Sequence, residues 1–497
     1  MNIAMSSANT PGFDNSYTRL PERFYSRQMP VPVSKPGLIR VNSVLADQLG
    51  FDTEWLKSDE GVAFAAGNFA PQGTDPIATV YAGHQFGGWN PQLGDGRAIL
   101  LGEVIAKDGD RYDIQLKGSG RTPYSRGGDG RAPLGPVLRE YILSEAMAVL
   151  GVPTTRALAA ATTGEWVQRE GRQPGAVLVR TASSHIRIGT VQYFAAKKDI
   201  EAVRLLVDHV IQRHYPHATE ATNPARAMLD GVIARQANLV AHWQSLGFIH
   251  GVMNTDNMLL SGETIDYGPC AYMDEFDPAM VFSSIDHGGR YAYQNQPHIA
   301  HWNLAMLAQS LLPLLDEDEK KAVASGQAAI NAFPGLHMAA YHRHMGKKLG
   351  FSGHETGDER LIQDLLALMS EHESDFTLTF RRLSDLANPG AGGDIAEIFE
   401  LPENFAPWLK RWRERLLEDS QNSSERQTAM YAVNPVFIAR NHLVEEAIVA
   451  AVSRQDYETF ETLVNVLEKP FEYRDSLASY ALPPRPEQIV KQTFCGT

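Results

Sequence analysis

Cysteine is scarce in this sequence, and so are long apolar runs. Only Cys270 and Cys495 occur among 497 residues, too few for a disulfide scaffold or for a structural zinc site built on cysteines. No stretch approaches the roughly 18 consecutive apolar residues of a membrane helix, and residues 1–20 have neither the basic start nor the apolar core of a secretory signal. We therefore expect a protein of the reducing cytoplasm that is neither exported nor membrane-spanning.

Positive charge is also in deficit. The chain has 45 Lys and Arg residues against 59 Asp and Glu residues, a net charge of −14, which argues against a general affinity for nucleic acid. An anionic ligand would therefore need a local basic patch. The length exceeds the size at which one hydrophobic core stops growing, so we expect two or more packed units.

The hydrophobic periodicity predicts a β-rich part followed by an α-rich part. Strand-like runs at 97–106 and 111–117 are joined by a turn at 107–110, and Lys117 faces away from the apolar side of its run. Two more strands are expected at 155–162 and 176–182, around a turn at 171–175. A helix is expected from Pro136 to Leu150, with Glu140 one turn inside it. Later helices are expected at 199–214, 224–245, 298–315, 359–371 and 436–454.

The segment 117–139 reverses the acidic balance of the chain. It contains one acid, Asp129, six glycines, and five basic residues: Lys117, Arg121, Arg126, Arg131 and Arg139. This composition predicts a polyphosphate site in a tightly folded loop, and the alternative is a solvated basic surface. Gly94, Gly96 and Arg97 form either a second phosphate-binding turn or an ordinary turn. Arg180 and Arg187 suit phosphate as well, although such residues also form surface ion pairs.

The segment His250-Gly-Val-Met-Asn-Thr-Asp-Asn257 is followed by Asp266-Tyr-Gly. Protein kinases have a catalytic His-Arg-Asp, an Asn five residues after that Asp, and then Asp-Phe-Gly, with the Asn and the second Asp on magnesium. His250, Asn257 and Asp266 fall in this register. The position of the kinase catalytic Asp is Val252, which accepts no proton. The nearest carboxylate that can replace it is Asp256.

Four segments resemble the selenoprotein O family of protein adenylyltransferases: YAGHQFGGWNPQLGDGRA, LKGSGRTPYSRGGDGRA, RTASSHIRIGT and HGVMNTDN. The resemblance runs from about residue 20 to the C-terminus. It implies an α+β, protein-kinase-like two-lobe fold with a β-rich N-lobe, an α-helical C-lobe and a helical C-terminal extension. The expected boundaries are an N-terminal extension at 1–75, the N-lobe at 76–185, the C-lobe at 186–330, and the extension and tail at 331–497.

The resemblance also implies an activity, in which AMP moves from an inverted ATP to Ser, Thr or Tyr hydroxyls of protein substrates, or UMP moves when manganese is bound. By motif, Lys117, Arg180 and Arg187 would hold the outer phosphates, and Glu140 would orient Lys117. Asn257 and Asp266 would bind Mg²⁺ or Mn²⁺, and Asp256 would act as base. The remaining residues that would line the nucleotide site are Gly94, Gly96, Arg97, Asp129 and Gly130.

Two other functions are compatible with the motifs. One is a phosphotransferase that uses Asp256 as its base, and the other is a catalytically silent pseudokinase scaffold that binds ATP structurally. The presence of both metal ligands argues against a scaffold.

The two cysteines raise a separate question. Cys495 occupies the position of the selenocysteine in some family members, and Gln492 stands where a preceding redox cysteine would be. A Cys270–Cys495 bridge would tie the tail across the active face, and the alternative is that both residues are ordinary thiols.

Overall fold

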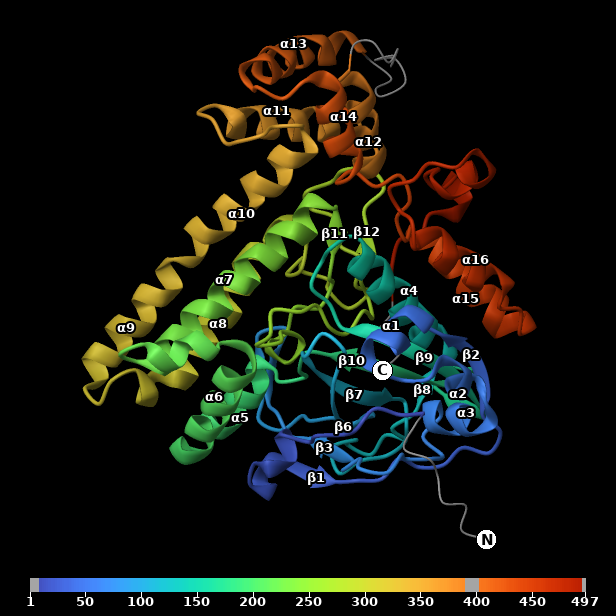
Figure 1. Ribbon diagram of the computed structural model, residues 1–497. Coiled ribbons are helices and arrows are strands. Elements are labelled where there is room, and N and C mark those ends of the chain that lie inside the picture. Colours follow the sequence, from blue (N-terminus) through green and yellow to red (C-terminus); the bar gives the residue numbers. More distant parts are fainter. Residues whose placement is uncertain (1–8, 389–401, 494–497) are drawn as a thin grey trace.

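The computed structural model describes residues 9–388 and 402–493, which form a β-rich first part and a helical second part, as expected (Figure 1). The strands are β1 (Tyr25–Arg27), β2 (Gly37–Val41), β3 (Ile77–Thr79), β4 (Gly83–Gln85), β5 (Gly88–Asn90), β6 (Ala98–Ile105), β7 (Arg111–Lys117), β8 (Ala132–Pro133), β9 (Arg156–Gln168), β10 (Arg172–Ala182), β11 (Phe248–Ile249) and β12 (Ala271–Tyr272).

The helices are α1 (Ser43–Leu49), α2 (Thr53–Lys57), α3 (Asp59–Ala65), α4 (Leu134–Val149), α5 (Ile188–Ala196), α6 (Ile200–His214), α7 (Pro224–Ser245), α8 (Gln296–Leu315), α9 (Glu319–Asn331), α10 (Phe333–Lys348), α11 (Asp358–Glu371), α12 (Phe376–Leu386), α13 (Pro402–Glu418), α14 (Ser423–Tyr431), α15 (Asn441–Arg454) and α16 (Glu458–Leu467). None of the helices in the described ranges is long and apolar enough to cross a membrane.

The main sheet has eight strands in the order β1-β3-β6-β7-β10-β9-β2, with β8 paired to β10. The predicted hairpin of β6 and β7 is confirmed. Strands β9 and β10 are longer than predicted, and their connection spans 169–171 instead of 171–175 because β10 already begins at Arg172. Strands β1 and β2 occupy the two ends of the sheet, so residues of the predicted N-terminal extension complete it. The proposed domain boundaries themselves remain a prediction.

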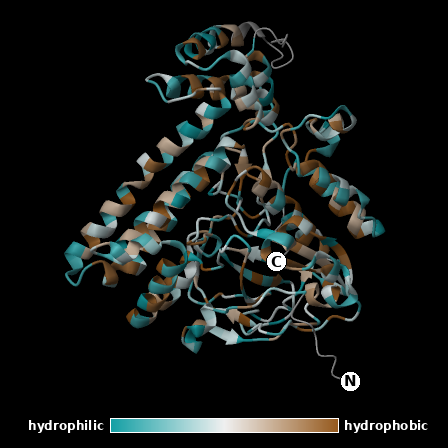
Figure 2. Cartoon of the chain, viewed as in Figure 1, coloured by the Kyte–Doolittle hydropathy of each residue, from teal (hydrophilic) through white to brown (hydrophobic). Residues whose placement is uncertain are grey.

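Both faces of the sheet are covered by helices, so successive strand residues enter different cores. Ile99 and Leu101 of β6 pack with Trp55 and its neighbours in α1–α3. Leu100, between them, packs with Tyr141 of α4 on the other side. This two-residue period is the expected geometry of a strand. Figure 2 shows brown, hydrophobic residues along the strands and alternating colours along the long helices.

The second half is built around long helices that lie side by side. Helix α7 packs against α8 and α10, and helices α11–α14 gather at the end away from the sheet (Figure 1). The predicted helices at 199–214, 224–245, 298–315 and 359–371 are confirmed as α6, α7, α8 and α11. Helix α15 starts at Asn441 and not at 436, because the backbone N–H groups of Val436 and Phe437 donate to Pro470 O. The helices without a predicted counterpart are α1–α3, α5, α9, α10, α12–α14 and α16.

The described tail ends beside the segment that follows Asp266. Thr493 Oγ1 donates to Pro269 O at 2.6 Å, and Thr493 N donates to Phe282 O at 2.8 Å. Cys270 is buried next to Pro269. Cys495 lies outside the described residues, so the Cys270–Cys495 bridge stays a prediction.

Lys348, at the end of α10, generates a stability prediction. It is 4% exposed, and its Nζ lies 4.5 Å from the ring centre of Phe380. Burial lowers the pKa of Lys348 to about 7, while the unfolded chain keeps this proton to about pH 10.4. We expect Lys348→Met to raise the free energy of unfolding at pH 7 by roughly 1–3 kcal/mol, because the charge is no longer desolvated.

The gain should shrink as the pH rises from 7 towards 10. In that interval the unfolded wild-type chain binds a proton that the folded chain has lost, so the wild type gains stability with pH. Urea unfolding at pH 7 and pH 9 measures both effects. The matched control is the exposed neighbour Lys347→Met. A destabilised Lys348→Met variant would contradict the prediction.

Candidate active site

All twelve residues predicted for the site line one cavity of about 580 Å³. It lies between the α4 side of the sheet and the loops around residues 250–268. Its lining has seven basic residues (Arg97, Lys117, Arg126, Arg131, Arg169, Arg180, Arg187) and five acidic ones (Asp95, Asp129, Glu140, Asp256, Asp266). The cavity is therefore a local basic region in a chain whose net charge is −14.

Strand register places the first basic residues. Gln115 of β7 is the direct partner of Arg180 in β10, and Lys117 is the partner of Leu178. Side chains two residues apart on a strand share a face, so Lys117 and Arg180 both point towards α4. There Lys117 Nζ binds Glu140, and Arg180 Nη1 binds Glu140 Oε1 at 3.0 Å. The predicted direction of Lys117, away from the apolar side of its strand, is confirmed.

Asp266 is the point at which the basic residues meet. Its carboxylate is 2.9 Å from Lys117 Nζ, 2.8 Å from Arg180 Nη1 and 2.8 Å from Arg187 Nη1. Burial by itself would raise the pKa of Asp266, but these three cations hold it well below its usual range. The residue has a φ of 64°, a conformation that non-glycine residues adopt at a small cost and that is common at functional sites.

His250 anchors the first residues of the loop at 250–257. Its Nε2 lies 2.8 Å from Ile265 O, and a carbonyl only accepts, so this nitrogen carries the proton. His250 thereby ties the loop to the segment of Asp266. Asn257 Nδ2 donates to Val252 O at 3.0 Å. Val252 lines the cavity at the position where a kinase has its catalytic Asp, and it brings no proton acceptor.

Asp256 is the carboxylate of this loop that reaches the cavity. Burial raises the pKa of Asp256 to about 6, against the lowering effect of Arg187, whose Nη1 also donates to Asp256 O. The side chain is therefore largely ionised at neutral pH. A carboxylate with a pKa near the working pH is suited to accept a proton from a substrate.

The glycines predicted to approach phosphate have a packing role as well. A side chain at Gly94 would meet Tyr124 Cγ at 2.5 Å, and one at Gly96 would meet Tyr124 O at 2.8 Å. Gly130 has a φ of 68° and also lacks space for a side chain, because its Cβ would lie 2.1 Å from Gly120 O. Asp129 accepts two hydrogen bonds from Arg169, both of 3.0 Å.

The interpretation of the whole segment 117–139 as a phosphate site is wrong for Arg139. This residue is buried, and its guanidinium donates to Cys270 O at 3.2 Å and to Asn441 Oδ1 at 3.1 Å. It lies on α4 facing α15, because it is one residue, about 100° of helix, from Glu140. The sequence did not single out several other lining residues, among them four with large side chains: Tyr81, Gln85, Tyr124 and Ile285. Three of them belong to the quoted motifs or lie next to them.

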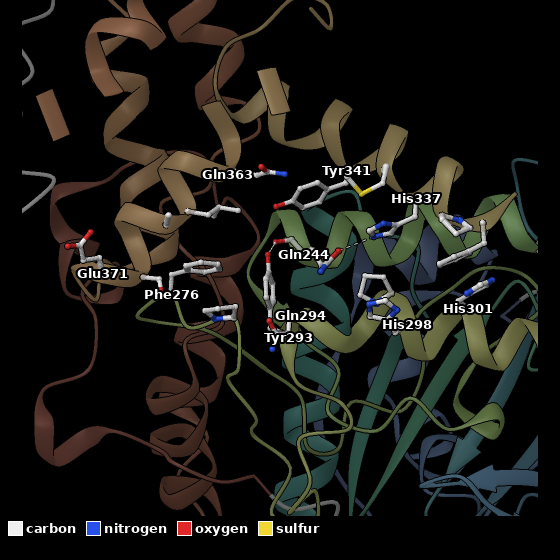
Figure 3. Close-up of a pocket in the computed structure, with 18 residues that line it drawn as sticks. Gln244, Phe276, Tyr293, Gln294, His298, His301, His337, Tyr341, Gln363 and Glu371 are labelled. Atoms are coloured by element: carbon white, nitrogen blue, oxygen red, sulfur yellow. Dashed lines mark hydrogen bonds between the residues drawn. The ribbon is translucent and has the colours of Figure 1, made fainter. Parts of the chain in front are cut away.

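A second cavity, of about 860 Å³, lies between α8, α10, α11 and the segment 276–294 (Figure 3). It is lined mainly by aromatic and proline side chains, with His298, His301 and His337 among them. His337 Nε2 lies 2.9 Å from Gln244 Oε1. The lining contains one acid, Glu371, and no Lys or Arg. Phosphate groups would find no counter-charge there, so the smaller cavity is the candidate active site.

The excess of basic residues in the smaller cavity suits an anion with several charges, beside the largely ionised carboxylate of Asp256. Comparison with known proteins gives the family. The family described as "Protein adenylyltransferase SelO" matches residues 8–468. The chain therefore belongs to the SelO family, as its motifs indicate. It is an enzyme of the nucleotidyltransferase class.

Similar proteins from three bacteria are each named "Protein nucleotidyltransferase YdiU". The protein of Bradyrhizobium diazoefficiens is 59% identical, and the alignment covers 98% of this chain and 99% of that protein. The proteins of Rhizobium etli and Rhodopseudomonas palustris are each 58% identical, with the same coverage.

The residues present fit the divalent metal that a nucleotidyltransferase requires. Asn257 and Asp266 supply an amide oxygen and a carboxylate, the hard oxygen donors that Mg²⁺ and Mn²⁺ prefer. Within 9–388 and 402–493, no three His, Cys, Asp or Glu side chains form a metal cluster. Sites for Mg²⁺ commonly have one or two carboxylates and are completed by substrate phosphates and water.

The position of Lys117 predicts an effect on ATP binding. We expect Lys117→Met to raise the dissociation constant for ATP at least about tenfold, because the cavity loses a buried cation that would face the phosphates of a bound nucleotide. Isothermal titration calorimetry with ATP and Mg²⁺ measures this. The control is Lys107→Met in the exposed β6–β7 turn, where Lys107 pairs with Asp47 at 2.6 Å. An unchanged dissociation constant for Lys117→Met would contradict the placement of the phosphates.

Proposed function

We propose that this chain transfers AMP from ATP to Ser, Thr or Tyr hydroxyls of proteins, on a kinase-like two-lobe fold. The observation that carries the proposal is the convergence of Lys117, Arg180 and Arg187 on Asp266, with Asp256 in the same cavity. The family and the names of the relatives support it.

In this proposal, Lys117, Arg180 and Arg187 bind the outer phosphates of ATP. Arg180 and Arg187 are 2% and 3% exposed, so their charges act in a region of low dielectric. Each is held in place by other groups, Arg180 by Gln115 at 2.6 Å and Arg187 by the ring of Tyr81. Rigid guanidinium groups suit phosphate oxygens. In the proposed binding mode the outer phosphates lie against these cations, and the α-phosphate is the reacting group.

The proposed reaction uses Asp256 as general base. The hydroxyl oxygen of the acceptor attacks the α-phosphorus, its proton passes to Asp256, and the bond from the α-phosphorus to the bridging oxygen breaks so that pyrophosphate leaves. Asn257 and Asp266 would hold the divalent metal, which would supply neutralisation of phosphate charge and polarisation of the phosphoryl group. UMP transfer from UTP with Mn²⁺ would use the same residues.

A labelling experiment separates this reaction from its alternatives. The chain is incubated with dialysed bacterial lysate proteins and Mg²⁺, and with ATP labelled at either the α- or the γ-phosphate. We expect α-label in protein, chain or lysate, and its loss with EDTA. Transfer of γ-label alone would show a phosphotransferase. Bound ATP with no transfer of either label would show a scaffold.

Two substitutions test the separate roles of the acids. Asp256→Asn should lower transfer at least about 100-fold and leave ATP binding within about twofold, because only the proton acceptor is lost. Asp266→Ala should lower both transfer and metal-dependent ATP binding, because a charged metal ligand is lost. The control is Asp208→Asn on the exposed side of α6. Wild-type transfer by either active-site variant would refute the assigned role.

A further inference from the structure

The short hairpin of β4 and β5 covers the loop that carries Asp256. Its strands pair in the register Gly83↔Asn90, His84↔Trp89 and Gln85↔Gly88. The two turn residues, Phe86 and Gly87, have φ values of 51° and 82°, the pattern of a tight two-residue hairpin turn. The tight turn gives the hairpin a defined position for each of its side chains.

Three successive hairpin residues each bind one residue of the loop. His84 N donates to Thr255 Oγ1 at 2.7 Å, and Phe86 N donates to Asn254 Oδ1 at 3.1 Å. Between them, the side chain of Gln85 donates from Nε2 to Asp256 Oδ2 at 3.1 Å. The backbone contacts thus fix the hairpin on the loop, and the side-chain contact fixes the carboxylate.

The two oxygens of Asp256 have different surroundings. Oδ1 is buried and has no hydrogen-bond partner among the described residues. It faces Gly83, where a methyl group would lie only 2.5 Å away. Oδ2 is held by Gln85, which itself lines the cavity. Oδ1 is therefore closed off by its burial, and Oδ2 is the oxygen that a residue of the cavity lining contacts.

We propose that Gln85 is a positioning residue, which holds Asp256 Oδ2 where the acceptor hydroxyl of the protein substrate donates its proton. The proposal rests on the proposed function, since it assigns a partner to the base. Gly83 contributes to the same positioning, because its missing side chain leaves room for Asp256 Oδ1. A base displaced by about 1 Å can lose 100-fold in rate, so a single amide donor has a large effect here.

Near-isosteric substitution distinguishes positioning from general support. Gln85→Ala removes the donor, and we expect the maximal rate of α-label transfer to fall about tenfold. Gln85→Glu keeps the shape but places a carboxylate against Asp256, so we expect a fall of at least about 100-fold. The apparent KM for ATP should stay within about twofold in both. A residue needed only for packing would give the opposite order, with Gln85→Glu the milder change.

Two further variants complete the set. Gly83→Ala keeps Gln85 but fills the space of Oδ1, so it should also lower the maximal rate and spare ATP binding. The matched control is Gln92→Glu, the same substitution at an exposed position of the same segment outside the cavity lining. It should behave as wild type.

A structural measurement makes the test independent of activity. Crystal structures of the wild type and Gln85→Ala should show the Asp256 carboxylate turned or shifted by about 1 Å in the variant. An unmoved carboxylate, or a Gln85→Glu variant at least as fast as Gln85→Ala, would overturn the proposal. Absence of α-label transfer by the wild-type chain would instead contradict the proposed function, and the crystal structures would still decide the role of Gln85.

Discussion

The ion cluster on Asp266 is the interaction on which the rest of the site depends. The carboxylate of Asp266 pairs with three buried cations, contributed by β7, the end of β10 and the residue before α5, and Glu140 of α4 pairs with two of them. Each of these charges would be costly to bury alone. The cluster therefore holds the sheet, α4 and the loop of Asp266 in one arrangement. In the proposed function the same cations bind phosphate oxygens, because a ligand with several negative charges can share them with the carboxylate.

The carboxylate chemistry of the site is divided between two environments. Asp266, among cations, is held strongly ionised, whereas burial shifts Asp256 towards neutrality and leaves it able to exchange a proton near neutral pH. Two acids with pKa values pushed apart suit two tasks, holding charge and moving a proton. The absence of an acid at Val252 fits this division, since Asp256, the proposed proton acceptor, stands four residues along the loop.

Much of the fold was legible in the sequence, because strand and helix periodicities are local properties. Strand alternation predicts that Lys117 and Leu116 point to different faces of the sheet, and Lys117 does lie beside Glu140. The long helices also begin and end within a few residues of the predicted positions. Predictions failed where partners distant in sequence decide the outcome. Pro470 O accepts hydrogen bonds from residues 436 and 437, so α15 begins later than predicted. Arg139 donates to Asn441 and therefore does not line the cavity.

The sequence by itself determined the family, the order of the motifs and most of the charged residues in the site, because these depend on residue type and spacing. Only the tertiary structure decided which groups meet. It showed that Arg180 lies opposite Gln115, that three cations share Asp266, and that Gln85, from a hairpin 171 residues earlier, holds Asp256. Such contacts are fixed by strand register and loop closure over long chain separations, which residue patterns do not encode locally.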